Sequence, residues 1–146
     1  MILKFRHVGL VTNDLEKMIN FYTKVLNFKV KNIFEISSSD FQKGIDIKDA
    51  KAKMAHLTYN DFEIEIFEFN HKYNRNNELS YANYPGYRHI AFIVDNIESF
   101  YKKLINENVS FISEPITVME PENVKGYKFV YLKDPEVNII ELNQLP

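Results

Sequence analysis

One segment of the chain occurs twice. The first copy starts at His7 and reads His-Val-Gly-Leu-Val-Thr-Asn-Asp-Leu-Glu, and the second starts at His89 and reads His-Ile-Ala-Phe-Ile-Val-Asp-Asn-Ile-Glu. Each copy runs from a histidine through apolar, partly β-branched residues typical of a strand to an Asn/Asp pair that can cap a helix. The repeat therefore predicts two similar modules, one after the other along the chain.

An amphipathic helix is expected after each Asn/Asp pair. Apolar side chains recur at helical spacing, namely Leu15, Met18, Ile19, Tyr22 and Leu26 in the first copy and Ile97, Phe100, Tyr101, Leu104 and Ile105 in the second. Charged and polar residues occupy the opposite face in both copies, as in helices that cover a sheet. The first helix is predicted to end near Asn27.

The similarity continues into two β-hairpins. Residues 53–65 align with residues 128–141, with one extra residue in the second turn. The turns are expected at Asn60-Asp61 and Asp134-Pro135, and the strands that follow them at 62–69 and 137–142.

A further short strand is expected around 28–34, with a counterpart near 109–112. The pattern then predicts an α+β fold of two tandem βαβββ modules within a single domain. Module 1 covers about 1–70 and module 2 about 88–146, and an irregular connection at 71–87 joins them. Residues 35–49, with three serines and a glycine, are expected to form a mobile excursion of module 1.

Composition excludes several classes of function. The net charge is −2 over 146 residues, so nothing attracts the chain to nucleic acid or to anionic lipid. No stretch approaches the roughly 20 apolar residues that span a bilayer, and we expect a cytoplasmic protein without membrane or nucleic-acid partners. The chain has no cysteine, so a bound metal must rest on His, Asp and Glu.

The repeat preserves a histidine at the start of the first strand and a glutamate late in the last strand. These residues are His7 and Glu65 in module 1 and His89 and Glu141 in module 2. Taken singly, such residues are usually structural or solvent-exposed, but a repeated pair of pairs favours a divalent metal site. Imidazole and carboxylate ligands suit Zn, Ni, Mn, Co or Fe(II) and leave positions open for substrate.

The sequence resembles the vicinal oxygen chelate superfamily, which includes glyoxalase I, methylmalonyl-CoA epimerase, fosfomycin-resistance thiol transferases, extradiol dioxygenases and bleomycin-binding proteins. The resemblance rests on four ordered segments, which are His7-Val-Gly-Leu with Phe21 to Phe28, Phe62-Glu-Ile-Glu-Ile-Phe67, Arg88 to Asp95, and Tyr131 to Leu142. It implies a curled open sheet around a central cavity, commonly in a homodimer, with metal ligands at His7, Glu65, His89 and Glu141.

Two positions complicate the resemblance. Val137 stands where members commonly carry glycine in an Asp-Pro-x-Gly turn, which alters a turn and leaves the ligand positions untouched. Glu63 competes with Glu65 for the ligand position, because alternation places both on one face of the strand. Glu65 is preferred because the Ile-Glu-Ile-Phe spacing matches the ligand strand of the family.

The expected activity is that of a metal-dependent lyase or isomerase of the glyoxalase I type. It would act on a small oxygenated substrate or its thiol conjugate, with Glu141 or Glu65 as the base that removes a proton next to a metal-bound oxygen. An extradiol dioxygenase needs a further acid/base histidine, for which His56 is a candidate, although packing or cavity lining is the more ordinary role for it.

Two other activities stay open. A fosfomycin-type thiol transferase is disfavoured because Gly126 to Tyr131 lacks the Arg-Ser-Tyr pattern of that group. A sequestering protein without catalysis could use some of the 12 Phe and 9 Tyr to line an aromatic crevice. The retained ligand residues argue against that class.

Overall fold

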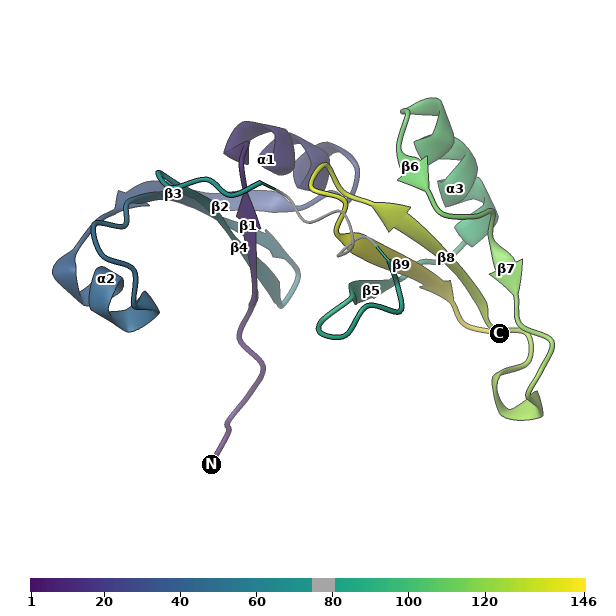
Figure 1. Cartoon of the computed structure of the whole chain (residues 1–146). Coiled ribbons are helices and arrows are strands. Elements are labelled where there is room, and N and C mark those ends of the chain that lie inside the picture. Colours follow the sequence, from purple (N-terminus) through teal and green to yellow (C-terminus); the bar gives the residue numbers. More distant parts are fainter. Residues whose placement is uncertain (75–80) are drawn as a thin grey trace. The chain divides into compact units, whose positions relative to one another are not determined.

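The structure is a computed structural model that describes residues 1–74 and 81–146. The chain divides into two compact units, Met1–Asn74 (unit 1) and Arg75–Pro146 (unit 2) (Figure 1). Part of the expected connection at 71–87, namely residues 75–80, lies outside the described residues.

Unit 1 is a four-stranded sheet with two helices. In chain order its elements are β1 (Val8–Thr12), α1 (Leu15–Lys24), β2 (Lys29–Ile36), α2 (Ser39–Ile45), β3 (Ala52–Tyr59) and β4 (Phe62–Phe69). The strand order is β1-β4-β3-β2, with β1 parallel to β4 and the other neighbours antiparallel. Helix α1 packs on one face of this sheet (Figure 1). The predicted βαβββ order is confirmed, with α2 as an addition.

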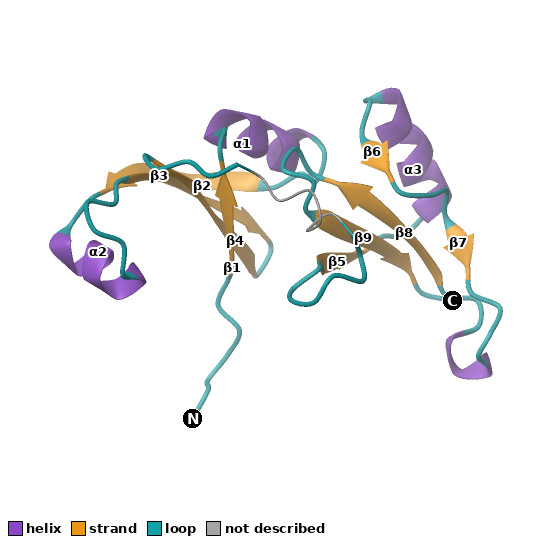
Figure 2. Ribbon diagram, in the orientation of Figure 1, coloured by secondary structure: helices purple, strands orange, loops and turns teal. Residues whose placement is uncertain are grey.

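Unit 2 repeats this plan in a five-stranded sheet. Its elements are β5 (His89–Ile93), α3 (Ile97–Asn106), β6 (Ser110–Phe111), β7 (Ile116–Thr117), the short 3-10 helix η2 (Glu122–Val124), β8 (Lys128–Lys133) and β9 (Ile139–Gln144). The order is β5-β9-β8-β6, with β7 also paired to β8 and β5 parallel to β9. Figure 2 shows the same succession of strand, helix and strands in the two units.

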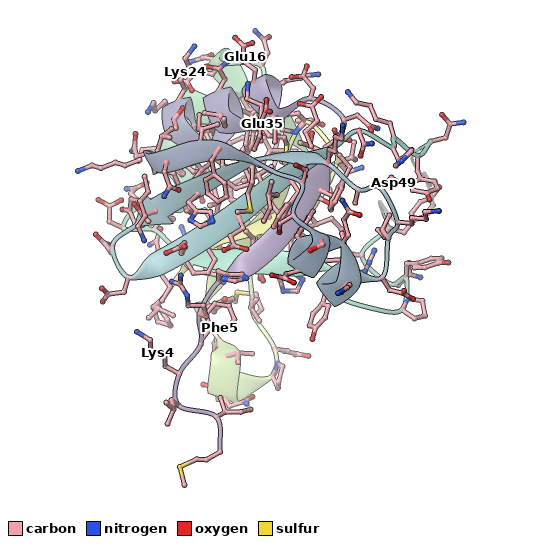
Figure 3. The ribbon with its side chains drawn as sticks, turned by 90° about the vertical axis from the view of Figure 1, so that its left-hand side faces the viewer. Lys4, Phe5, Glu16, Lys24, Glu35 and Asp49 are labelled. Atoms are coloured by element: carbon pink, nitrogen blue, oxygen red, sulfur yellow. The ribbon has the colours of Figure 1, made fainter. Side chains whose placement is uncertain are left out.

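Both principal helices begin as the repeat predicts. The side chain of Asp14 accepts a hydrogen bond from the backbone N–H of Lys17 at 3.0 Å, and that of Asn96 accepts one from Ser99 at 2.9 Å. These caps satisfy backbone donors that have no partner inside the helix. Figure 3 shows Glu16 and Lys24 on the outer side of α1, away from the sheet.

The alternation of residues along the strands separates the core from the functional face. The helix-covered face contributes fully buried side chains, which are Leu57, Ile64 and Ile66 in unit 1 and Val130, Leu132, Ile140 and Leu142 in unit 2. Because successive side chains point to opposite faces, Glu63 and Glu65 lie on the sheet face opposite α1, and Glu141 lies on the sheet face opposite α3.

Residues 35–49, expected to form a mobile excursion, contain the end of a strand and a helix. Strand β2 continues to Ile36 and α2 follows it, with Ser38 as the cap that accepts from the backbone N–H of Phe41 at 3.2 Å. The ring of Phe41 stacks on Phe69 of β4, with centroids 6.2 Å apart. One cap and one aromatic contact therefore order a segment whose serines resemble a loop.

The ends of several elements differ from their predicted positions. Helix α1 ends at Lys24, three residues before Asn27, which adopts a positive φ of 59°. The last strand begins at Ile139 because Val137 lies in the preceding turn with a φ of 62°. The strand expected near 109–112 is reduced to β6. None of the helices among the described residues is long and apolar enough to span a membrane.

Candidate metal centre

In unit 1, neighbouring strands bring a histidine and a glutamate together. His7 lies just before β1, and Glu65 lies in β4, where it pairs with Gly9 of the parallel strand β1. The two side chains approach on the face that α1 leaves uncovered, with His7 Nε2 at 3.2 Å from Glu65 Oε2. The parallel register thus places the two residues that the repeat singled out in module 1 side by side.

Unit 2 contains the same arrangement. His89 opens β5, and Glu141 lies in β9, where it pairs with Ala91 of the parallel strand β5. His89 Nε2 lies 3.1 Å from Glu141 Oε2. Each unit therefore carries one His–Glu pair, built from equivalent strands in the same register and with the same pair of atoms in contact.

The spacing within each pair fits two ligands of one ion. Ligands at about 2.0–2.2 Å from a metal and at right angles to each other are roughly 3 Å apart, which is close to both distances. Imidazole nitrogen and carboxylate oxygen are donors that first-row divalent ions accept. The donor set and its spacing therefore fit the metal that the resemblance implies.

A second histidine contacts Glu65 from the other side. His56 of β3 pairs directly with Glu65 across the β3–β4 ladder, and its Nε2 lies 3.1 Å from Glu65 Oε1. Its Nδ1 lies 3.6 Å from Glu63 Oε1, so the ring stands between two carboxylates. His56, Glu63 and Glu65 form a compact group of potential ligand atoms. The hairpin register could have revealed this contact, but the sequence analysis considered His56 as an acid/base histidine or as a packing or cavity-lining residue, and not as a partner of Glu65.

Glu63 is buried, 6% exposed, and is surrounded by cations. Arg6 Nη1 and Lys31 Nζ lie 3.2 and 3.4 Å from its Oε2. Burial opposes ionisation, but the hydrogen bond from Lys31 and the charges of Arg6, Lys31 and His56 outweigh it and lower the pKa of Glu63 below its usual value. The contacts of Glu63 are thus with His56, Arg6 and Lys31, whereas His7 contacts Glu65. This agrees with the preference for Glu65 over Glu63 in the sequence analysis.

Glu141 Oε1, the oxygen that does not contact His89, lies next to the side-chain amide of Asn143. With the amide of Asn143 oriented so that each atom meets a complementary partner, its nitrogen donates to Glu141 Oε1 at 3.0 Å and its oxygen accepts from the Tyr127 hydroxyl at 2.7 Å. Burial, together with the charge of Glu141, raises the pKa values of Tyr127 and Tyr131. Both phenols therefore stay protonated near neutral pH, and the partners of Glu141 Oε1 are neutral.

The guanidinium of Arg88 and one pocket of unit 1 lie apart from these pairs. The guanidinium of Arg88 stacks over the ring of Tyr84 at 5.7 Å, and Arg75 lies outside the described residues. A pocket of about 510 Å³ in unit 1 opens where β2 ends and β3 begins, and its lining includes Lys51 and Glu68 but neither His7 nor Glu65.

Comparison with protein families decides the classification. The model of the glyoxalase/bleomycin resistance protein/dioxygenase superfamily matches residues 4–142. The chain belongs to this superfamily. The match includes both His–Glu pairs, and it confirms the resemblance to the vicinal oxygen chelate proteins.

Individual relatives agree with this membership. The chain is 27% identical over 147 residues to the uncharacterised protein YwbC of Bacillus subtilis (strain 168), with 99% of each covered. It is 31% identical over 120 residues to a lactoylglutathione lyase of Schizosaccharomyces pombe, where the match covers 74% of this chain and 38% of that enzyme.

Solved structures show the same fold. A glyoxalase family protein from Bacillus cereus matches with a TM-score of 0.82 at 18% identity, over 99% of this chain and 95% of that one. The fosfomycin resistance protein FosX from Listeria monocytogenes, in complex with Mn(II) and sulfate, matches with a TM-score of 0.63 at 18% identity, over 100% and 95%. At these identities the likeness establishes the fold.

Proposed function

We propose that this chain is a metal-dependent lyase or isomerase of the glyoxalase I type. One divalent ion, held by His7, Glu65, His89 and Glu141, would serve a small oxygenated substrate or its thiol conjugate. The observation that carries the proposal is the matched construction of the two His–Glu pairs, with contacts of 3.2 and 3.1 Å on equivalent strands. The identity of the metal among Zn, Ni, Mn, Co and Fe(II) is left to the experiment.

The four side chains have distinct tasks in this proposal. When bound, the ion supplies Lewis-acid polarisation of a substrate oxygen. His7 and His89 are neutral nitrogen donors, and the two carboxylates offset the charge of the ion. Each carboxylate has one oxygen, Oε2, beside a histidine and a second, Oε1, beside another polar group of the sheet.

A carboxylate next to the substrate carbonyl can remove the proton from the neighbouring carbon. Glu141 and Glu65 are the two candidates for this base, because each lies on the sheet face opposite α1 or α3 and each contacts a histidine. The relative with lactoylglutathione lyase activity supports a reaction of this kind, although that similarity covers 38% of the enzyme.

The test is exchange of substrate hydrogen with solvent. The protein, reconstituted with a divalent metal, is incubated in deuterated water with the hemithioacetal of methylglyoxal, short acyl-CoA epimers and catechols in turn. We expect deuterium at the carbon next to the carbonyl of one of the first two. Glu141→Gln or Glu65→Gln should lower that rate about 10²–10⁴-fold, the usual value of a general base, with little loss of stability.

Two results would contradict the proposal, and a third requires a control. Ligand binding without exchange, unchanged after chelation of the metal, would identify a sequestering protein. Ring opening of catechol with consumption of oxygen would identify a dioxygenase. Loss of exchange in both Gln variants together with loss of folded protein would remove the evidence for a base, so thermal unfolding of each variant is the control.

We also propose that the chain forms a homodimer. Strands β1 and β5 stand at the ends of their strand orders, and Val11 and Ile93, at equivalent positions of the repeat, are 62% and 70% exposed. An edge strand with exposed apolar side chains is a ready site for pairing with another chain. Sedimentation at micromolar concentration should show a species of twice 17.3 kDa, and a homogeneous 17.3 kDa species would contradict the dimer.

A further inference from the structure

Glu65 Oε1 and Glu141 Oε1, the oxygens that do not contact His7 or His89, have different partners. In unit 1, Glu65 Oε1 faces the imidazole of His56 at 3.1 Å, across the β3–β4 ladder. In unit 2 the residue in the same ladder position is Tyr131, whose ring instead lies against His89 at 5.5 Å. Glu141 Oε1 is contacted by Asn143, two residues along its own strand, at 3.0 Å. The two units therefore share the His–Glu pair but not the group behind it.

The surroundings of His56 hold its ring in a defined place. The side chain is 14% exposed, and the ring of Phe34 from β2 meets it edge to face with centroids 5.5 Å apart. Glu63 lies on the Nδ1 side, 3.6 Å away, and Glu65 lies on the Nε2 side. Nε2 is buried and its N–H is not yet aligned with an acceptor, although Glu65 Oε1 is within hydrogen-bonding distance.

The same contacts argue against a separate ion at His56. The two ring nitrogens face different carboxylates, so a single ion here could use only one of the two contacts that His56 makes. Arg6 and Lys31, within 3.2 and 3.4 Å of Glu63 Oε2, already offset the charge of that carboxylate. A further cation beside them would meet repulsion.

We propose that His56 is a positioning residue for Glu65. Its Nε2–H holds Glu65 Oε1, so that Oε2 stays beside His7 Nε2 in the orientation that a metal ligand needs. Partners of this kind behind a ligand fix its direction, and their loss typically costs 10–100-fold in metal affinity. This inference rests on the proposed role of His7 and Glu65 as ligands, and it assigns to His56 a task that Asn143 performs in unit 2.

Three substitutions of His56 separate positioning from ligation. His56→Phe removes both nitrogens, and the fold should accept an aromatic ring there because unit 2 has Tyr131 at the equivalent position. His56→Gln keeps an amide N–H at about the reach of Nε2, whereas His56→Asn keeps one only at about the reach of Nδ1. His71→Phe, at an exposed position outside the site, controls for the loss of a histidine.

The measurements are the affinity for Co(II), by calorimetry, and the visible spectrum of the Co(II) form. His56→Phe and His56→Asn should bind Co(II) about 10–100-fold more weakly than the wild type, and His56→Gln should recover most of the affinity. All variants should keep the wild-type spectrum at saturation, because no ligand has changed. Thermal unfolding with chelator present should show that each variant is folded.

Several outcomes would overturn the inference. Wild-type affinity in His56→Phe would show that Glu65 needs no such support. If His56→Gln and His56→Phe bound Co(II) equally weakly and the Co(II) spectrum changed, His56 would be a ligand. If the wild type bound a second ion that His56→Gln lost, a separate metal site would lie at His56. In each of these cases, the proposed metal site would still be supported if His7→Ala lost its bound Co(II). Failure of the wild type to bind Co(II) or any other divalent ion would overturn both.

Discussion

The carboxylate of Glu68, near the end of β4, accepts a hydrogen bond from the backbone N–H of Leu15 at the start of α1, at 3.0 Å. The equivalent contact in unit 2 joins Gln144 to Ile97 at 2.9 Å. The last strand of each unit thus satisfies a free backbone donor at the N-terminus of its helix. The acceptor is a charged carboxylate in unit 1 and a neutral amide in unit 2. Substitution of Glu68 by Gln therefore measures how much the charge adds to the stability that this contact provides.

Stability below pH 5 should depend on Glu68. The hydrogen bond from Lys72 lowers its pKa below the usual 4.5, burial opposes this, and the N–H of Leu15 adds to the lowering. A carboxyl with a lowered pKa in the folded state contributes stability that is present above its unfolded pKa and is lost as the pH falls through the folded value. The free energy of unfolding, measured in urea from pH 7 to pH 3, should therefore fall less steeply with acid in Glu68→Gln than in the wild type.

Near neutral pH the same variant tests the hydrogen bond itself. Glu68→Gln keeps an acceptor for the N–H of Leu15, as Gln144 does for Ile97. Glu68→Ala leaves that N–H without its partner and should lower the free energy of unfolding by about 1–2 kcal/mol, and Glu68→Gln should lower it less. If Glu68→Gln and Glu68→Ala were equally destabilised at pH 7, the contact would owe its effect to charge alone.

A glycine at position 137 should stabilise the protein. Val137 has a φ of 62°, where a β-branched side chain crowds the backbone at a cost of about 1–2 kcal/mol. Glycine removes this strain but adds roughly 0.5–1 kcal/mol of unfolded-state entropy. The net gain in Val137→Gly should be about 0.5–1 kcal/mol by urea unfolding.

The neighbouring residue provides the control for this substitution. Glu136 precedes Val137 in the same turn and is not among the described residues with a positive φ, so Glu136→Gly brings the entropy without relieving strain. Glu136→Gly should destabilise while Val137→Gly stabilises. A loss of stability in both variants would show that the strain at Val137 is too small to measure.

The repeat made much of the fold predictable, because the same physical signals occur twice. Asp14 and Asn96 are caps followed by apolar residues at helical spacing, and both helices begin there. The short helix α2 was missed because its ordering comes from the contact of Phe41 with Phe69, which lies 28 residues further along the chain. Contacts between distant segments leave no local pattern.

The His–Glu pairs of the candidate site were predictable from the repeat, but the contact of His56 was not. The recurrence of His7 and Glu65 at His89 and Glu141 singled out two pairs, and in each unit the structure brings the members of a pair within about 3 Å of each other. The contact of His56 with Glu65 escaped notice because Tyr131 stands at the equivalent position, so the repeat gives no signal for it. The contacts of Glu63 with Arg6 and Lys31 depend on residues from the segment before β1 and from β2, which the pattern of β4 alone does not show.

The central proposal is that His7, Glu65, His89 and Glu141 are ligands of one ion, and the metal content of the protein tests it most directly. Wild type, His7→Ala and His89→Ala are reconstituted with Mn(II) or Co(II), freed of excess metal and analysed for metal per chain. We predict about one ion per chain in the wild type and nearly none in either variant, because removal of one ligand from a shared centre weakens the whole. Retention of a full ion in either variant, or two ions in the wild type with one lost in each variant, would contradict the account.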